Sequence, residues 1–187
     1  IYQHYANNPQ AFIDRLHSFS IASPLGLEIP GEGRPSIKGT ESRTWSKVSL
    51  PWKSIGYEVA LTPLQILTFY NAVANDGVMV KPHFVKEIRQ GGMPVKVIEP
   101  EIINRKIASK EAIALAKVML EGVVEHGTGS ALKNPIYKVA GKTGTAQIAQ
   151  NAGGYNKSDY KASFVGYFPA KNPKYSCIVV INNPSKG

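Results

Sequence analysis

Apolar residues recur at helical spacing in three segments of the chain, residues 9–19, 62–75 and 109–125. The second segment opens with Thr-Pro, a typical N-cap followed by a first helical residue, and the third opens with Ser109 as its N-cap. A stripe of this period buries one face of a helix. The pattern therefore predicts three amphipathic helices.

The third of these segments carries the longest apolar stripe and ends near Gly127, where glycine readily adopts the left-handed closing conformation. We expect this helix to serve in packing. Its apolar residues are Ile113, Leu115, Ala116, Val118, Met119, Leu120, Val123 and Val124.

A hairpin is predicted where residues 83–90 and 95–98, both rich in strand-forming residues, flank Gly91-Gly92. Two consecutive glycines tolerate the positive φ values that a tight hairpin turn requires. We expect this hairpin to be peripheral.

Three further segments favour strands, residues 137–148, 161–168 and 175–182. The short polar link between the last two predicts an antiparallel pair. The continuous apolar block 177–181 is typical of a strand buried on both faces, so Cys177 is expected to be a small buried hydrophobe.

Residues 20–54 are rich in proline, glycine and serine and show weak periodicity, which predicts an irregular segment that Trp45 and Trp52 pin to the core. No internal repeat is visible. The length is sufficient for about one domain with a single core, so residues 1–187 are expected to form part of one domain.

The formal net charge of +9 does not indicate nucleic-acid binding, because lysines and arginines are scattered and form no basic run. The single cysteine excludes an internal disulfide. The four histidines show no ligand spacing with cysteine or carboxylates, so we expect no metal site and no cofactor.

The richest candidate chemistry lies in the run Ala140-Gly-Lys-Thr-Gly-Thr-Ala-Gln147. On an extended chain Thr143 and Thr145 point the same way, while Gly144 leaves its backbone open to a ligand. A phosphate-binding P-loop would need glycine where Ile136 stands, so nucleotide binding is not expected.

This run belongs to an ordered series of motifs, found at residues 56–65, 126–131, 139–147 and 164–173. In order and spacing the series resembles the C-terminal half of class B penicillin-binding proteins, with a preference for the division-type members, and Lys-Thr-Gly is a signature of that superfamily. The resemblance implies an α+β fold, a partial penicillin-binding-protein/β-lactamase-like transpeptidase fold. Three strands of its five-stranded antiparallel sheet, packed with helices, would lie in this chain.

The resemblance also implies roles for individual residues. Lys142 would supply positive potential for the substrate carboxylate and ease proton transfer, and the Thr143 and Thr145 hydroxyls would bind that carboxylate. The backbone N–H of Thr145 would form half of an oxyanion hole. Gly144 would leave room for the substrate backbone, and Tyr155, in a glycine-rich loop, would contribute an aromatic wall. Thr128, in Gly-Thr-Gly, is expected only to shape a turn.

The family's nucleophilic serine lies in an upstream Ser-x-x-Lys tetrad followed by Ser-x-Asn. This chain contains no Ser-x-Asn. Of its two Ser-x-x-Lys strings, the one at 130–133 falls inside the Gly-Thr-Gly element and the one at 158–161 lies after Lys142, so both are read as coincidence. No nucleophile is therefore assigned, and we expect the chain to be an inactive C-terminal piece of a longer enzyme.

By resemblance, the parent would cross-link peptidoglycan stem peptides ending in D-Ala-D-Ala by serine acyl transfer and would bind β-lactams. It would be anchored to the inner membrane by an N-terminal helix, face the periplasm and meet cell-wall synthesis or division proteins. Two alternatives stay open: a β-lactamase or β-lactam sensor of the same superfamily, and a noncatalytic interaction module of a cell-wall complex.

We predict that the 187-residue chain alone forms no covalent adduct with fluorescent penicillin, because no acylating serine can be assigned in it. Gel fluorescence after incubation checks this. A labelled band that disappears on mutation of Ser130 or Ser158 would contradict the assignment.

Overall fold

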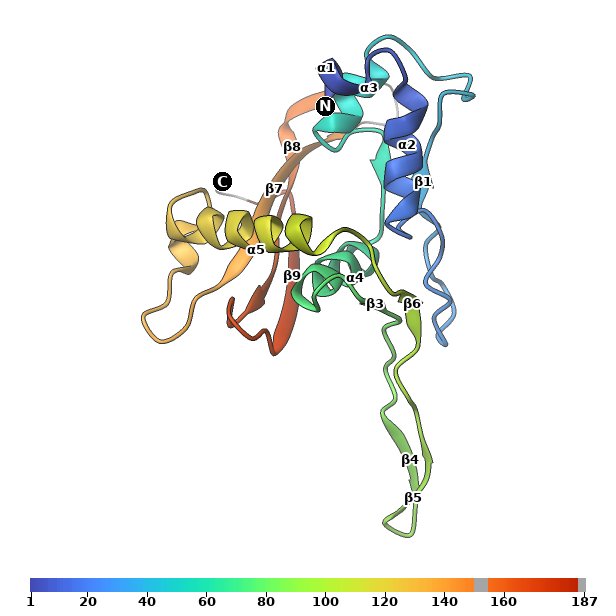
Figure 1. Cartoon of the computed structure of the whole chain (residues 1–187), viewed down its shortest axis with the longest axis vertical. Coiled ribbons are helices and arrows are strands. Elements are labelled where there is room, and N and C mark those ends of the chain that lie inside the picture. Colours follow the sequence, from blue (N-terminus) through green and yellow to red (C-terminus); the bar gives the residue numbers. More distant parts are fainter. Residues whose placement is uncertain (150–154, 185–187) are drawn as a thin grey trace. The chain divides into compact units, whose positions relative to one another are not determined.

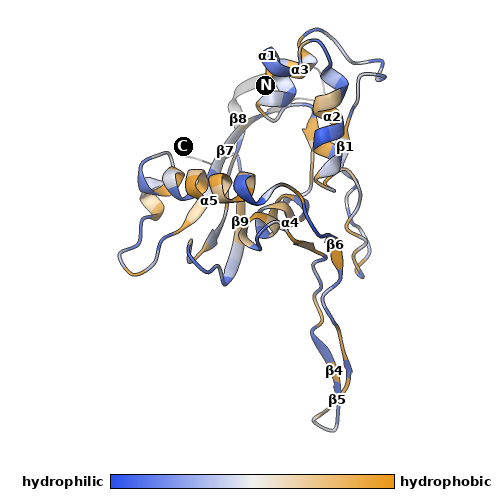
Figure 2. Cartoon of the chain, viewed as in Figure 1, coloured by the Kyte–Doolittle hydropathy of each residue, from blue (hydrophilic) through white to orange (hydrophobic). Residues whose placement is uncertain are grey.

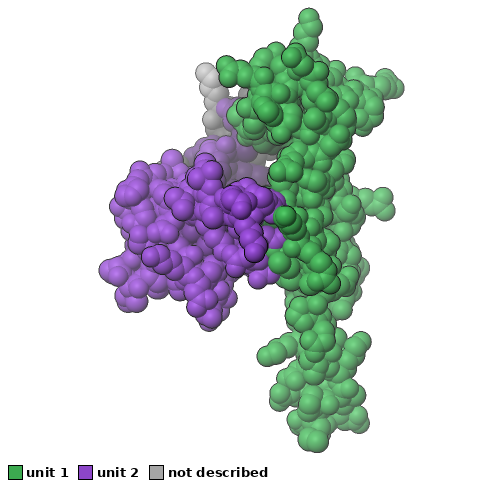
Figure 3. All heavy atoms as spheres, viewed as in Figure 1, with its two compact units in different colours: residues 1–69, 78–107 green, residues 70–77, 108–187 purple. Residues whose placement is uncertain are grey.

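The computed structural model describes residues 1–149 and 155–184 of the chain (Figure 1). These residues form two compact units (Figure 3). Unit 1 comprises Ile1–Phe69 and Val78–Ile107, and unit 2 comprises Tyr70–Gly77 and Ala108–Gly187. Helices and antiparallel strands occur in both, which confirms the α+β class, whereas the single-domain organisation stays a prediction.

Unit 1 consists of short elements, with three two-stranded antiparallel sheets, β1-β2, β3-β6 and β4-β5. Its elements are α1 (Tyr2–Tyr5), α2 (Pro9–Ser18), β1 (Ser36–Ile37), α3 (Ser49–Ser54), β2 (Val59–Ala60), β3 (Met79–Val80), β4 (Glu87–Gln90), β5 (Met93–Val97) and β6 (Ile102–Asn104).

Unit 2 holds one helix packed on a three-stranded antiparallel sheet of order β7-β8-β9. Helix α4 begins in unit 1 and ends in unit 2. The elements are α4 (Pro63–Ala74), α5 (Lys110–Glu125), the 3-10 turn η1 (Ser130–Leu132), β7 (Ala140–Ala149), β8 (Tyr155–Phe168) and β9 (Tyr175–Asn182).

The three predicted helices are confirmed, and their first turns are capped by side chains. Asn8 caps α2, and Ser109 caps α5 by accepting a hydrogen bond from a backbone N–H. At α4, Thr62 N donates to Gln65 Oε1 at 2.8 Å and Gln65 N donates to Thr62 Oγ1 at 3.2 Å. This reciprocal pair satisfies two backbone donors that a helix start otherwise leaves unpaired.

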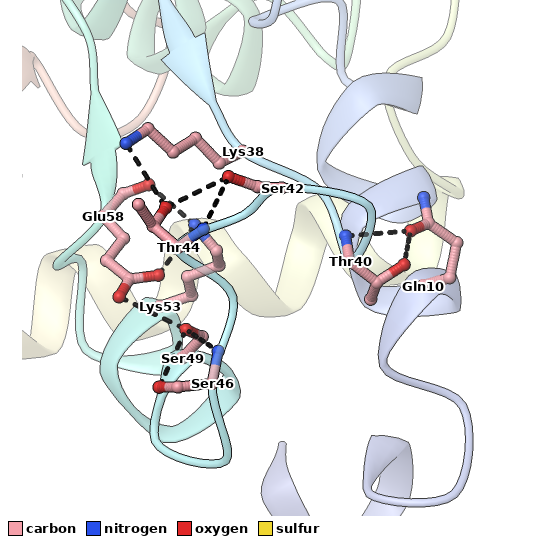
Figure 4. Close-up of polar contacts among 9 residues, drawn as sticks. All are labelled: Gln10, Lys38, Thr40, Ser42, Thr44, Ser46, Ser49, Lys53 and Glu58. Atoms are coloured by element: carbon pink, nitrogen blue, oxygen red, sulfur yellow. Dashed lines mark hydrogen bonds and ion pairs between the residues drawn. The ribbon is translucent and has the colours of Figure 1, made fainter.

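The segment expected to be irregular contains a short helix, α3, held by a buried lysine (Figure 4). Lys53 Nζ donates to Glu58 O at 2.8 Å and pairs with Glu58 Oε2 at 3.3 Å. Trp45 packs on the cluster around Phe12, as expected. Trp52 is 40% exposed, so its predicted role as a core anchor is wrong.

The glycine hairpin is confirmed, although β4 is shorter than the predicted first strand and β5 begins earlier than the predicted second one. Gly91 and Gly92 have φ values of +58° and +83°, the conformation for which glycine was expected there. Both strands are mostly exposed, in agreement with a peripheral position.

The sheet of unit 2 centres on β8, which pairs with β7 on one side and β9 on the other. Ala140 on β7 and Tyr167 on β8 are directly opposite each other and fully buried, and with Ala74 they form the unit's core cluster. Because its phenol is removed from water, the pKa of Tyr167 is raised to about 12.

One expectation about a buried strand is wrong. Strand β9 is an edge strand, and Cys177 is exposed, as are Val179 and Ile181. Helix α5 packs on β7 as expected, and its apolar stripe, visible in Figure 2, buries Ile113 and Val124. Three of the remaining apolar side chains on α5 are more than 60% exposed, Leu115, Val118 and Met119.

Glycine at position 141 is required by the pairing of β7 with β8. Gly141 pairs with Gly166, and a Cβ at 141 would come within 2.5 Å of Val165 O and also meet the Phe164 ring. A Cβ at Gly144 would meet only the Ser163 hydroxyl, at 2.7 Å, and that side chain can rotate.

We predict that Gly141→Ala lowers the free energy of unfolding by about 1–3 kcal/mol, the usual cost of overpacking, because backbone must move to admit the methyl group. Gly144→Ala is the matched control and is expected to cost less. Urea denaturation followed by circular dichroism measures both. Equal losses would show that close strand approach at Gly141 does not limit stability.

Candidate functional site

The Lys-Thr-Gly-Thr run lies on β7, an edge strand of the unit 2 sheet (Figure 1). Lys142 and Thr145 are exposed, and Thr143 and Gly144 are half-buried. The run is therefore accessible on a strand whose second edge has no partner among the described residues. Such an edge presents unpaired backbone donors and acceptors.

Lys142 carries a charge that the described part of the chain does not neutralise. Its Nζ donates to Thr143 O at 2.8 Å and lies 3.5 Å from Thr143 Oγ1, and among the side chains that the structure describes, those of residues 1–147 and 160–184, no carboxylate forms an ion pair with it. An ammonium group with only neutral partners favours an anionic ligand.

The backbone of Thr143 and Thr145 faces the open edge of β7. Ser163 Oγ donates to Gly144 O at 3.4 Å, which places that carbonyl on the β8 side. Hydrogen-bonding groups of an antiparallel strand alternate between its two edges from one residue to the next. The N–H and C=O of Thr143 and Thr145 consequently point away from β8.

The Gly-Thr-Gly turn reaches this strand, which the sequence did not predict. Thr128 Oγ1 lies 2.6 Å from Thr143 Oγ1, a hydroxyl–hydroxyl hydrogen bond across 15 positions of sequence. Thr128 thus joins the candidate site in addition to shaping a turn. The only sequence signal for such a role was that Gly-Thr-Gly belongs to the ordered series of motifs. The side-chain contact itself depends on how α5 packs against β7.

Charged contacts fix α5, the turn's support, within unit 2. Lys117 Nζ pairs with Asp76 at 2.6 Å, and Lys138 Nζ pairs with Glu121 at 2.7 Å. The hydrogen bond that Lys138 Nζ donates to the Glu121 carboxylate is the main reason that the pKa of Lys138 is raised. These pairs connect α5 to the end of α4 and to the start of β7.

Tyr155 is the first residue of β8, opposite Ala149, rather than part of a loop as expected. Its side chain and residues 150–154 lie outside the described residues. The predicted aromatic wall therefore stays a prediction.

A cavity of about 320 Å³ lies in unit 1, lined by Ser36, Lys38, Thr44, Glu58, Val59 and Ala60. Its charged groups have partners within the unit, since Glu58 pairs with Lys53 and Lys38 reaches Thr44 Oγ1 at 3.5 Å (Figure 4). It contains none of residues 142–145. The uncompensated charge and open backbone of β7 make that strand the stronger candidate.

The chain is similar to known proteins along most of its length. Residues 4–187 match the family model of the penicillin binding protein transpeptidase domain. The chain is 31% identical over 187 residues to penicillin-binding protein PbpB of Mycobacterium tuberculosis and 30% identical over 174 residues to peptidoglycan D,D-transpeptidase FtsI of Buchnera aphidicola.

These matches cover 95% and 92% of the chain but only 27% and 29% of the two relatives. Among solved structures, penicillin-binding protein 3 of M. tuberculosis complexed with ampicillin matches with a TM-score of 0.82 and 31% identity, covering 93% of this chain and 40% of that one. The three-stranded sheet with helices is thus a partial transpeptidase fold, as expected.

Proposed function

The chain belongs to the penicillin-binding protein transpeptidase family, and from this premise we propose that it forms one wall of the acyl-donor site of a peptidoglycan D,D-transpeptidase. The observation that carries the proposal is the edge strand β7, which presents the unneutralised Lys142 beside two threonine hydroxyls and outward-facing backbone. A peptide ending in a carboxylate is complementary to this arrangement.

The first contribution of the wall is to hold the terminal carboxylate of a D-Ala-D-Ala stem peptide. The Thr143 and Thr145 hydroxyls share one face of β7 and donate to the carboxylate oxygens, while the Lys142 ammonium supplies the opposite charge. An extended substrate backbone adds alongside the open edge at Gly144, in the manner of an added strand.

The second contribution is to the transition state. When the nucleophile attacks the penultimate carbonyl, negative charge develops on its oxygen, and the outward N–H of Thr145 donates to it. Removing one such donor typically slows acylation about 100- to 1000-fold. Lys142 acts in the same step by easing proton transfer to the leaving D-alanine amine.

The attacking serine and its base come from a Ser-x-x-Lys tetrad elsewhere in the whole protein, because one string of that form in this chain falls inside the Gly-Thr-Gly element and the other lies after Lys142. The serine forms an acyl-enzyme and releases D-alanine, and an amine of a second stem peptide then takes the acyl group. A β-lactam enters the same path and stops at the acyl-enzyme.

The proposed substrate also implies where in the cell the protein acts. The substrate is extracytoplasmic cell wall, so the active domain faces the periplasm and the whole protein is held at the inner membrane. No helix of the described residues is long and apolar enough to span a bilayer. The FtsI relative supports a division role, with division proteins as partners.

We predict that Lys142→Ala in the full-length protein slows acylation by fluorescent penicillin by about 100-fold or more, because charge stabilisation and proton transfer are both lost. Lys133→Ala, another exposed lysine of unit 2, is the matched control and should acylate normally. The second-order acylation rate constant measures the effect, with the melting temperature as a check on folding. Unchanged kinetics for Lys142→Ala would remove β7 from the site.

A further inference from the structure

The hydroxyl of Thr128 is held close to the proposed carboxylate-binding face of β7. Its Oγ1 lies 2.6 Å from Thr143 Oγ1, and Thr143 Oγ1 also lies 3.5 Å from Lys142 Nζ. Thr143 is therefore the middle member of a three-group polar chain. Lys142 and Thr143 already have proposed roles, and Thr128 has none.

The turn that carries Thr128 is fixed to the end of α5. The backbone N–H groups of Gly127 and Gly129 both donate to Val123 O, at 3.1 and 3.0 Å, and Ser130 N donates to Gly127 O at 3.2 Å. A Cβ at position 127 would come within 2.9 Å of Val123 O, so glycine is required there. The Thr128 hydroxyl thus comes from a helix end rather than from a free loop.

The single proton of the Thr143 hydroxyl limits the hydrogen bonds that it can donate. A hydroxyl has one proton and two lone pairs, and an ammonium group only donates. One lone pair of Thr143 Oγ1 therefore faces Lys142. If Thr143 donates to Thr128, its only proton is used. If Thr128 donates instead, both lone pairs of Thr143 are filled and its proton is free for a ligand.

A bound carboxylate selects between these two arrangements. Hydrogen bonds to a charged acceptor are about twice as strong as those between neutral groups. With an anion present, the arrangement in which Thr143 donates to it is therefore favoured, and Thr128 supplies the compensating proton. Without Thr128, the Thr143 hydroxyl would lose this partner and rotate among its alternatives.

We propose that Thr128 is a positioning residue that donates to Thr143 Oγ1 and so directs the Thr143 hydroxyl proton toward the carboxylate of the acyl donor. This inference rests on the proposed function, since it assigns a residue that orients the Thr143 hydroxyl within the same site. Thr128 itself does not touch the reacting atoms.

The test uses the full-length protein and benzylpenicillin, with stopped-flow kinetics that separate the dissociation constant of the noncovalent complex from the acylation rate. Thr128→Val keeps the side-chain shape and removes the hydroxyl. We expect it to raise the dissociation constant about 5- to 10-fold, the effect of losing one neutral hydrogen bond, with a smaller change in the acylation rate. Thr128→Ser should restore the wild-type value.

Two comparisons separate positioning from a merely structural role. In a Thr143→Val background, Thr128→Val should have no further effect, because the hydroxyl through which it acts is absent. For the methyl ester of benzylpenicillin, which lacks the carboxylate, Thr128→Val should change little. Ser130→Ala removes an exposed hydroxyl from the same turn and is the matched control, with wild-type kinetics expected.

An unchanged dissociation constant in Thr128→Val would overturn the inference. So would an effect that adds to that of Thr143→Val, or one of equal size for the ester. A wild-type protein that takes no label overturns the proposed function and this inference together. If the wild-type protein is labelled and Thr128→Val leaves the dissociation constant unchanged, this inference alone is overturned.

Discussion

The candidate site depends on one constraint, namely that β7 is paired along one edge only within residues 1–149 and 155–184. Pairing with β8 fixes the register, in which Gly144 lies opposite Ser163, and the alternation of an antiparallel strand then turns the backbone of Thr143 and Thr145 outward. A register shift of one residue would turn the backbone groups of Thr143 and Thr145 toward β8. It would also move the side chains of Lys142 and both threonines to the other face of the sheet from the one that each now occupies. Register therefore determines whether this strand can receive a ligand.

The register is in turn fixed by close packing at the start of β7. Gly141 and Gly166 pair without side chains, and the adjacent Ala140 and Tyr167 are buried together. Helix α5 packs on β7, and ion pairs to Asp76 and Lys138 hold it within the unit. The same helix carries the turn that places Thr128 beside Thr143. The contacts that pack unit 2 therefore also position the groups of the candidate site.

Local sequence was sufficient for much of the fold. The helices α2, α4 and α5 have caps and periodicity of their own, and the Gly91-Gly92 hairpin has a specific turn signal. The two-residue strands β1, β2 and β3 were missed because they exist only through distant partners. Helix α3 was missed because a six-residue helix containing proline has almost no periodic signal.

The candidate site was also predictable from the sequence only in part. Residues 142–145 were identified from the ordered motifs, and the structure places them on an accessible edge strand. The contact of Thr128 with Thr143 could not be predicted, because it joins two segments that only α5 brings together. The exposure of Cys177 was missed because an apolar block does not reveal how many faces of a strand are covered.

The most direct test of the account is a crystal structure of the full-length protein acylated by a carboxylate-bearing β-lactam. The account predicts that the ligand carboxylate accepts hydrogen bonds from Thr143 Oγ1 and Thr145 Oγ1, and its acyl oxygen from Thr145 N, each within about 2.7–3.2 Å. A ligand that extends along the open edge of β7 would support the central claim. An acyl group whose carboxylate and carbonyl both lie away from residues 142–145 would contradict it.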